Sequence, residues 1–320
     1  MRFTNWRLKS RACRSKGFPA AGLSRFAGAL IGFSFLTASI AAQPRLERIS
    51  QLSPPYEAFA PSEPVALCAS PDGNLYLLDA QLAAVVMLSS EGQLLNEVGG
   101  PGSGLLQFNQ PSDLSINSGL DLFVADRGND RILRLNRRLY YLWEFRSLEN
   151  TPPELVFEKP RSVVQGPRGD LFLADEGNDR ILKIAPGGEV LFSFGTFGLE
   201  RGSLSRPFRI ELDEVNGIWV LDALGHVVHF DEYGGYVEDI PALLAGDPTG
   251  LAASAKIIWV GSDSCLWAWD PGNRLIFNFN PAEIGIFDPA PWVDIFGRGD
   301  LLWILDARGR IYRYRIVLPR

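Results

Sequence analysis

Five aspartates recur at one position of a repeating pattern, and their type and spacing suggest chemistry. Each lies 15 residues after a proline, and they are Asp79, Asp126, Asp175, Asp222 and Asp306. A ring of carboxylates at one level would suit a divalent metal. However, an aspartate at a strand end can also accept backbone N–H bonds and stabilise a turn. Because residues that recur once per unit diverge in space, we interpret these five as structural turn residues.

The only two histidines of the chain, His226 and His229, are the candidates for a zinc site. Positions i and i+3 of a strand face opposite sides of the sheet, whereas two ligands of one metal favour i and i+2. We therefore expect no zinc site at this pair. The chain also has no G-x-S-x-G motif, and GPGSG at residues 100–104 lacks the lysine of a phosphate-binding loop. Nucleophilic and nucleotide chemistry are therefore disfavoured.

An internal repeat must position any site in this chain. Residues 111–135 (PSDLSINSGLDLFVADRGNDRILRL) and 160–184 (PRSVVQGPRGDLFLADEGNDRILKI) match at nearly every position. Fainter copies share the frame, and one of them has Ser262 in place of the aspartate. The units begin near Pro64, Pro111, Pro160, Pro207, Pro248 and Pro291. A fixed period of this length predicts a repeat architecture.

Each unit is predicted to form four short strands. In the third unit we expect strands at 162–165, 170–174, 180–184 and 190–194, with GPRG, DEGN and PGG between them. Short apolar runs without a helical period suit sheets that are covered on both faces. The pattern predicts an all-β fold, a six-bladed β-propeller of four-stranded blades.

The two ends of the chain are predicted to close this ring. The last unit has only three strands, the final one at 310–317, and Leu46–Leu52 (LERISQL) is the candidate for its fourth strand. Such an N-terminal strand would join the last blade and protect edges that would otherwise be open.

Residues 1–42 have the composition of a signal peptide. They contain seven basic residues and no acidic residue, and the uncharged run 26–42 ends in small residues. The run is also at the lower limit for crossing a bilayer, so an uncleaved N-terminal anchor is the alternative. We predict an exported protein, periplasmic or extracellular, with one propeller over residues 43–320 and membrane contact only through an uncleaved leader.

Charge and cysteine content limit the partners and the covalent framework. Of 31 basic residues seven lie in the leader, which leaves 24 against 37 acidic residues. This acidic balance disfavours nucleic acid as a partner, because a phosphate backbone is bound through clustered Lys and Arg. Beyond the leader only Cys68 and Cys265 remain, and we expect both to be unpaired buried thiols.

The phrase DLF(V/L)AD(R/E)GNDRIL resembles the NHL repeat, as do the linkers at 99–111 and 194–207. The resemblance covers roughly residues 60 to 320 and implies a six-bladed propeller. It is a poor guide to activity, because this fold hosts enzymes, sensor domains and binding modules.

The residues that follow the blade prolines lead into the inner strands and are expected to approach one mouth of the central tunnel. They are chemically mixed and are not dictated by the repeat. The candidate ligand-binding residues are Asp113, Arg161, Arg209 and Trp292.

Two functions follow from these patterns. The first is a non-enzymatic binding or scaffold module without a cofactor, for a protein or glycan partner in the cell envelope. The alternative comes from a resemblance to propeller hydrolases of the gluconolactonase type, which implies a metal-dependent lactonase or esterase with calcium or another divalent metal over the tunnel. Glu63 before Pro64 would be the metal ligand, but the E-G-P-x-W pattern is broken, with Leu67 where Trp is expected.

Overall fold

The computed structural model describes residues 44–56, 59–116, 121–147, 151–198, 200–240, 247–271 and 275–319. The prediction of a leader at 1–42 lies outside these residues. Within the described ranges, no helix is long and apolar enough to cross a membrane.

Six antiparallel sheets of four strands make up the fold. Blade 1 contains β2 (Pro64–Ala69), β3 (Leu75–Asp79), β4 (Ala84–Leu88) and β5 (Leu94–Gly99). Blade 2 contains β6 (Asp113–Ile116), β7 (Asp121–Asp126), β8 (Arg131–Asn136) and β9 (Tyr141–Phe145). Blade 3 contains β10 (Pro160–Gln165), β11 (Leu171–Asp175), β12 (Arg180–Ile184) and β13 (Val190–Phe194). Blade 4 contains β14 (Pro207–Leu212), β15 (Ile218–Asp222), β16 (Val227–Phe230) and β17 (Tyr236–Ile240). Blade 5 contains β18 (Pro248–Ser254), β19 (Ile257–Ser262), β20 (Leu266–Asp270) and β21 (Leu275–Phe279). Blade 6 contains β22 (Trp292–Arg298), β23 (Leu301–Asp306), β24 (Ile311–Val317) and β1 (Arg45–Leu52). Within the described ranges, three short 3-10 helices lie between strands: η1 (Arg127–Asn129), η2 (Pro153–Leu155) and η3 (Glu176–Asn178).

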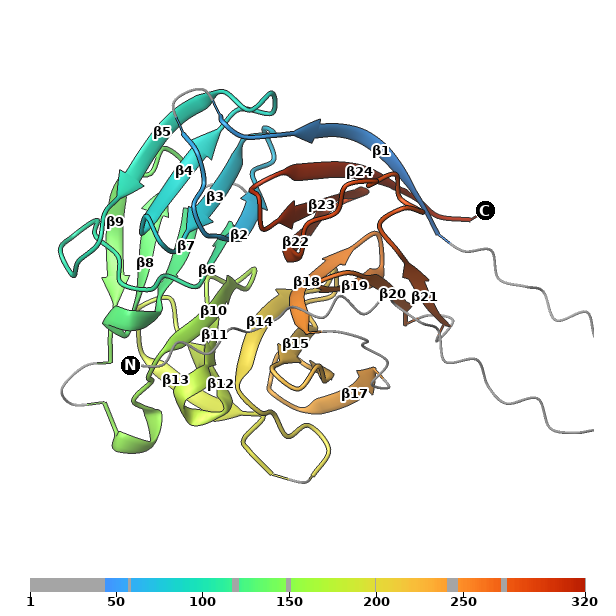
Figure 1. The fold of residues 1–320 in the computed structure, drawn as a ribbon. Coiled ribbons are helices and arrows are strands. Elements are labelled where there is room, and N and C mark those ends of the chain that lie inside the picture. The colour runs from blue at the N-terminus through green and yellow to red at the C-terminus, as the bar shows by residue number, and fades with distance from the viewer. Residues whose placement is uncertain are drawn as a thin grey trace, which may run out of the picture.

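The blades are arranged in a ring, and the first and last strands of the chain lie side by side (Figure 1). Strand β1 pairs antiparallel with β24, from Arg45 opposite Val317 to Leu52 opposite Ile311. The prediction of six four-stranded blades closed by an N-terminal strand is confirmed. The third blade shows how closely the boundaries agree, since β12 and β13 have the expected bounds and β11 is shifted by one residue.

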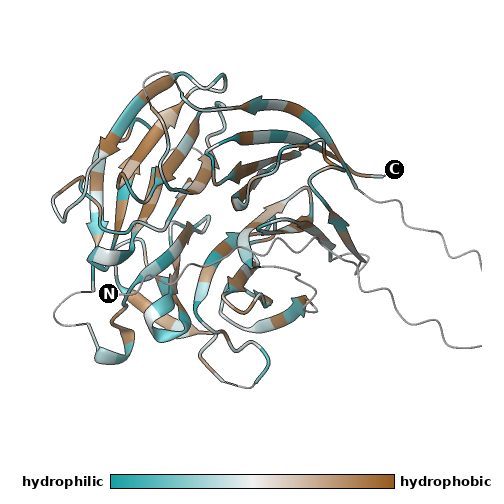
Figure 2. Cartoon of the chain, viewed as in Figure 1, coloured by the Kyte–Doolittle hydropathy of each residue, from teal (hydrophilic) through white to brown (hydrophobic). Residues whose placement is uncertain are grey.

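Strand composition follows distance from the tunnel axis. The second strands β3 and β11 are buried at every residue because neighbouring blades cover both of their faces. The outermost strands β5 and β17 alternate between half-buried and exposed residues. Figure 2 shows the contrast for β4, which is drawn mostly in hydrophobic colour, and for the outer strand β1, which is drawn in mixed colour.

Short turns with glycine join the strands at the face opposite the blade prolines. The Gly73 N–H donates to Ser70 O at 3.0 Å, and the Ser70 N–H donates to Asn74 O at 2.9 Å. Gly73 has a φ of 91°, and Gly169 in the corresponding GPRG turn has 87°. Glycine suits these positions because residues with a Cβ rarely adopt a positive φ.

The hydrophobic core is divided into six clusters, one at each interface between adjacent blades. The cluster between blades 6 and 1 includes Trp303 and Leu77, so the interface that closes the ring is packed like the others. Aromatic pairs on the outer strands help to fill these interfaces. Trp143 and Phe145 stack at 5.7 Å, and Phe145 in turn stacks on Phe157 at 5.2 Å.

Candidate functional site

The five recurring aspartates lie at strand ends and accept hydrogen bonds from the chain around them. All are fully buried: Asp79, Asp126, Asp175, Asp222 and Asp306. Asp79 accepts the backbone N–H groups of Ser62 at 2.6 Å, Glu63 at 2.9 Å and Leu82 at 2.8 Å. These bonds tie the linker before a blade to the turn between its second and third strands.

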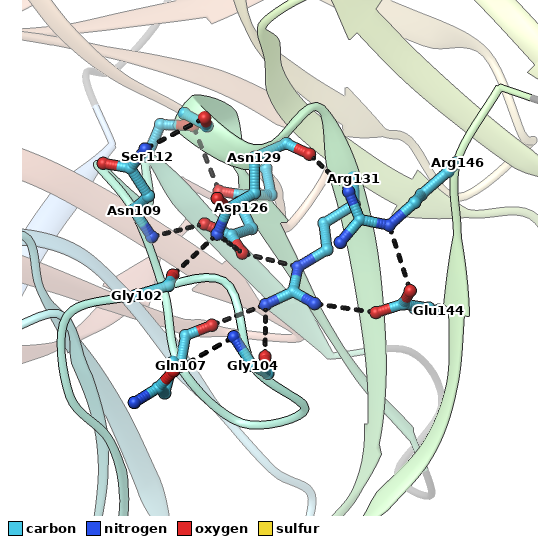
Figure 3. Close-up of polar contacts among 12 residues, drawn as sticks. Gly102, Gly104, Gln107, Asn109, Ser112, Asp126, Asn129, Arg131, Glu144 and Arg146 are labelled. Atoms are coloured by element: carbon cyan, nitrogen blue, oxygen red, sulfur yellow. Dashed lines mark hydrogen bonds and ion pairs between the residues drawn. The ribbon is translucent and has the colours of Figure 1, made fainter.

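In blade 2 the aspartate also forms a buried ion pair (Figure 3). Arg131 is 1% exposed, and its Nε donates to Asp126 Oδ2 at 2.7 Å. Its other nitrogens donate to Glu144 Oε2 at 2.7 Å and to the carbonyls of Gly104 and Gln107. The pair is buried and lies within one blade.

The two histidines and the two cysteines take no part in a shared site. His229 stacks on Trp219 with ring centroids 4.2 Å apart, whereas His226 lies near Asp222, with Nδ1 to Oδ2 at 3.1 Å. Cys68 and Cys265 are both buried and form no disulfide.

A bulge in the innermost strands creates two levels of side chains around the tunnel. In blade 1, Pro64 pairs with Asp79 and Ala66 with Leu78, so Val65 is the extra residue. The outer level consists of the residues at this position: Val65, Ser112, Arg161, Phe208, Thr249 and Val293. The inner level consists of the residues that follow them: Ala66, Asp113, Ser162, Arg209, Gly250 and Asp294.

The four predicted ligand-binding residues therefore divide between levels. Asp113 and Arg209 belong to the inner level, Arg161 belongs to the outer one, and Trp292 lies one residue before the outer level. Asp294 was not predicted from the sequence as a tunnel residue. The reason is that Trp292 pairs with Asp306 and so occupies the position that a proline has in the other blades. The repeat frame, counted from Pro291, consequently placed the sixth unit one residue out of register.

Three charged inner-level residues meet across the tunnel, and we call Asp113, Arg209 and Asp294 the floor cluster. Arg209 Nη1 lies 3.6 Å from Asp113 Oδ1, and its Nε lies 3.3 Å from Asp294 Oδ1. Arg209 also donates to Val65 O at 3.0 Å, while the Leu67 N–H donates to Asp294 Oδ2 at 2.8 Å. All three side chains are less than 10% exposed, so the cluster joins blades 2, 4 and 6 through buried charged groups.

Burial dominates the electrostatics of the floor cluster. It raises the pKa of Asp294 to about 7 and raises that of Asp113, and in both cases the charge of Arg209 opposes the shift. Burial alone would lower the pKa of Arg209, but the two carboxylates outweigh it and raise that pKa. Glu211, farther along β14, has its pKa raised by burial and by both aspartates. The cluster thus has one guanidinium shared between two carboxyl groups.

Two cavities lie along the tunnel. A cavity of about 170 Å³ includes all three floor-cluster residues in its lining, together with Glu211 and Arg298. A larger cavity of about 590 Å³, which we call the wide mouth, is lined by all six outer-level residues and by Trp292, Glu63, Arg127 and Arg209. The wide mouth lies within the usual size range of ligand-binding clefts.

The three arginines of the wide mouth differ in their partners. Arg209 faces two aspartates, and Arg127 Nε lies 2.7 Å from Glu176 Oε2. Arg161 has no ion pair or side-chain hydrogen bond with any residue that the structure describes, and its Nε is buried without a partner. Burial lowers the pKa of Arg161, and the charge of Arg209 adds to this.

The donor set of the wide mouth does not fit a divalent metal. Glu63, the ligand expected for a hydrolase, is exposed at the rim and shares the cavity with three arginines. Over the described ranges, no three His, Cys, Asp or Glu side chains are grouped so that they could hold a metal ion. Cations repel one another, so the arginines favour an anion in this cavity.

Comparison with known proteins identifies the repeat and the fold. The NHL repeat model matches residues 108–135, and no curated protein matches the chain. A catalytically inactive virginiamycin B lyase from Staphylococcus aureus with quinupristin is similar, with a TM-score of 0.58 and 16% identity over 86% of this chain and 100% of that one.

Two further solved structures are similar to the chain. A streptogramin B lyase has a TM-score of 0.58 and 18% identity over 87% of this chain and 88% of that one. The Cps50 (Swd1) β-propeller domain of Myceliophteria thermophila has a TM-score of 0.57 and 12% identity over 85% of this chain and 100% of that one. At such identities the likeness shows the fold alone. The repeat match and the closed ring of six four-stranded blades together support the prediction of an NHL-repeat β-propeller.

Proposed function

We propose that this propeller is an exported, non-enzymatic binding module that holds a protein partner on the face around the wide mouth. The observation that carries the proposal is the coincidence of this cavity of about 590 Å³ with exposed apolar side chains on the surrounding loops. These side chains belong to linkers between blades or to turns that follow the recurring aspartates: Leu82, Leu105, Phe197, Leu224 and Phe287.

Exposed apolar side chains favour a protein over a glycan partner. Phe287 is 85% exposed and Phe197 is 73% exposed, and both lie in linkers that run to the start of an innermost strand. Exposed aromatic side chains are enriched at protein interfaces relative to the rest of the surface. The opposite face also exposes Val215 and Tyr233, but the cavity on that side is only about 170 Å³.

Binding is favoured over catalysis by the composition of the tunnel. The charged floor cluster is internally paired, and the wide mouth contains one carboxylate among three arginines. Two of the similar structures are named as lyases, and that activity is not proposed for this chain. The acidic balance of residues 43–320 supports a partner other than nucleic acid.

Export is part of the proposal and is supported by residues 1–42, whose basic segment and apolar run resemble a signal peptide. The partner would then lie in the cell envelope or outside the cell. Contact with a membrane would occur only through an uncleaved leader.

Site-specific photo-cross-linking in the native cells tests the binding face. A photoreactive residue at Phe197 or Phe287 is expected to give a discrete cross-linked protein band. Val215 and Tyr233 are the matched controls, because their exposures of 81% and 69% are similar and they lie in turns of the opposite face. Bands only from the control positions, or from none of the four, would overturn the proposal.

A further inference from the structure

Arg161 lines the wide mouth and forms no ion pair with any described residue. The other two arginines of the wide mouth, Arg127 and Arg209, are paired with carboxylates. A guanidinium in a half-buried setting loses part of its hydration, and a paired carboxylate ordinarily compensates for that loss. Among the described residues no carboxylate forms an ion pair with Arg161, although the more distant charges of Glu176 and Asp113 favour its charged form. The guanidinium therefore remains available to pair with an anion from outside the chain.

The surroundings of Arg161 limit the kind of anion that fits. The remaining outer-level residues that line the wide mouth are neutral: Val65, Ser112, Phe208, Thr249 and Val293. A volume of about 590 Å³ whose walls contain both polar and apolar side chains suits a group with an apolar stem and one charged end. The paired floor cluster below offers no second free cation, so a single carboxylate matches the site better than a multiply charged phosphate group.

We propose that the wide mouth receives an aspartate or glutamate side chain of the partner protein, with Arg161 as its binding residue. The planar guanidinium can donate two parallel N–H bonds to the two carboxylate oxygens, and such bidentate pairs are strong and specific. This inference rests on the proposed function, because the acidic side chain is presented by a protein held on the same face.

The test uses the purified full-length chain and small probes in place of the partner. N-acetyl-L-glutamate α-amide carries one side-chain carboxylate, and N-acetyl-L-glutamine α-amide is its neutral match. Binding of each is measured by NMR titration. The acid is expected to saturate at millimolar concentrations and to bind at least about tenfold more tightly than the amide, as a charge-assisted hydrogen bond predicts.

Variants assign the binding to Arg161. Arg161→Met should abolish binding of the acid. Arg161→Lys should weaken it, because lysine keeps the charge but lacks the two parallel N–H donors of the guanidinium. Arg168→Met on the opposite face is the control, since Arg168 is exposed and pairs with Glu232. Arg161 makes no side-chain bond within the described residues, so its variants should fold normally, as thermal unfolding will verify.

Each outcome decides the inference. Equal binding of acid and amide, no binding of either, or unchanged binding by Arg161→Met would overturn it. Tight binding of D-glucuronate but not of the glutamate probe would also overturn it in favour of an acidic glycan. If cross-links from Phe197 or Phe287 are found together with any of these results, the proposed protein-binding face stands. Only the proposal that Arg161 binds a carboxylate is then refuted.

Discussion

Replacement of Arg209 by methionine should destabilise the propeller strongly at pH 8. Methionine has a similar length but removes the cation that pairs with both Asp113 and Asp294. Removing one partner of a buried ion pair typically costs about 3–5 kcal/mol, because the remaining charge is buried without compensation. We expect a loss of that size in the free energy of unfolding, measured by urea denaturation.

The cost should be smaller at pH 5. The pKa of Asp294 is about 7 in the folded protein, well above the usual 3.8, so its contribution to stability is greatest below pH 4 and is lost as the pH rises towards 7. This difference corresponds to about 4 kcal/mol. Arg209 lowers the pKa of both aspartates, so without it both pKa values should rise further. Asp294 should then be protonated at pH 5, and less uncompensated charge would remain.

Arg134→Met provides the control for this experiment. Arg134 is 38% exposed and pairs with Asp121 at 2.5 Å, and exposed pairs usually contribute less than about 1 kcal/mol. A loss below about 1 kcal/mol for Arg209→Met at pH 8, or equal losses at pH 5 and pH 8, would refute the view that the floor cluster depends on a buried cation.

Three further perturbations test the scaffold. Arg131→Met should lower the free energy of unfolding by about 3–5 kcal/mol, because it leaves the fully buried Asp126 without its cation; a loss below about 1 kcal/mol would contradict this. Gly99→Ala should lower the melting temperature more than Gly100→Ala, since both have positive φ but only the first Cβ would lie 2.3 Å from a backbone oxygen; equal effects would contradict the contact argument. Deletion of residues 45–52 should expose the edge of β24 and cause aggregation in size-exclusion chromatography, and a stable monomer with an unchanged melting temperature would contradict closure by β1.

The fold could be predicted from the sequence because each unit repeats its own turn chemistry. A proline and an aspartate 15 residues apart form a pair across the first hairpin in several blades, as Pro64 and Asp79 do. Local signals of this kind also fixed the closing strand, since a three-stranded last unit and an unassigned strand at the N-terminus complete each other.

The site was less predictable because it depends on register between distant strands. A one-residue bulge separates Arg161, which faces the wide mouth, from the level that contains Arg209. Asp294 escaped notice because Trp292 replaces the proline of the other units in the pairing. Whether an arginine has a partner depends on side chains from other blades, which no local pattern reveals.

The central claim is that the wide-mouth face binds a protein through Arg161, and competition in the cross-linking experiment tests it most directly. With the photoreactive residue at position 287, N-acetyl-L-glutamate α-amide at millimolar concentrations should reduce the cross-linked band, whereas the neutral glutamine analogue should not. The Arg161→Met variant should give a weak band without any competitor. A strong band in that variant, unaffected by either compound, would contradict the account.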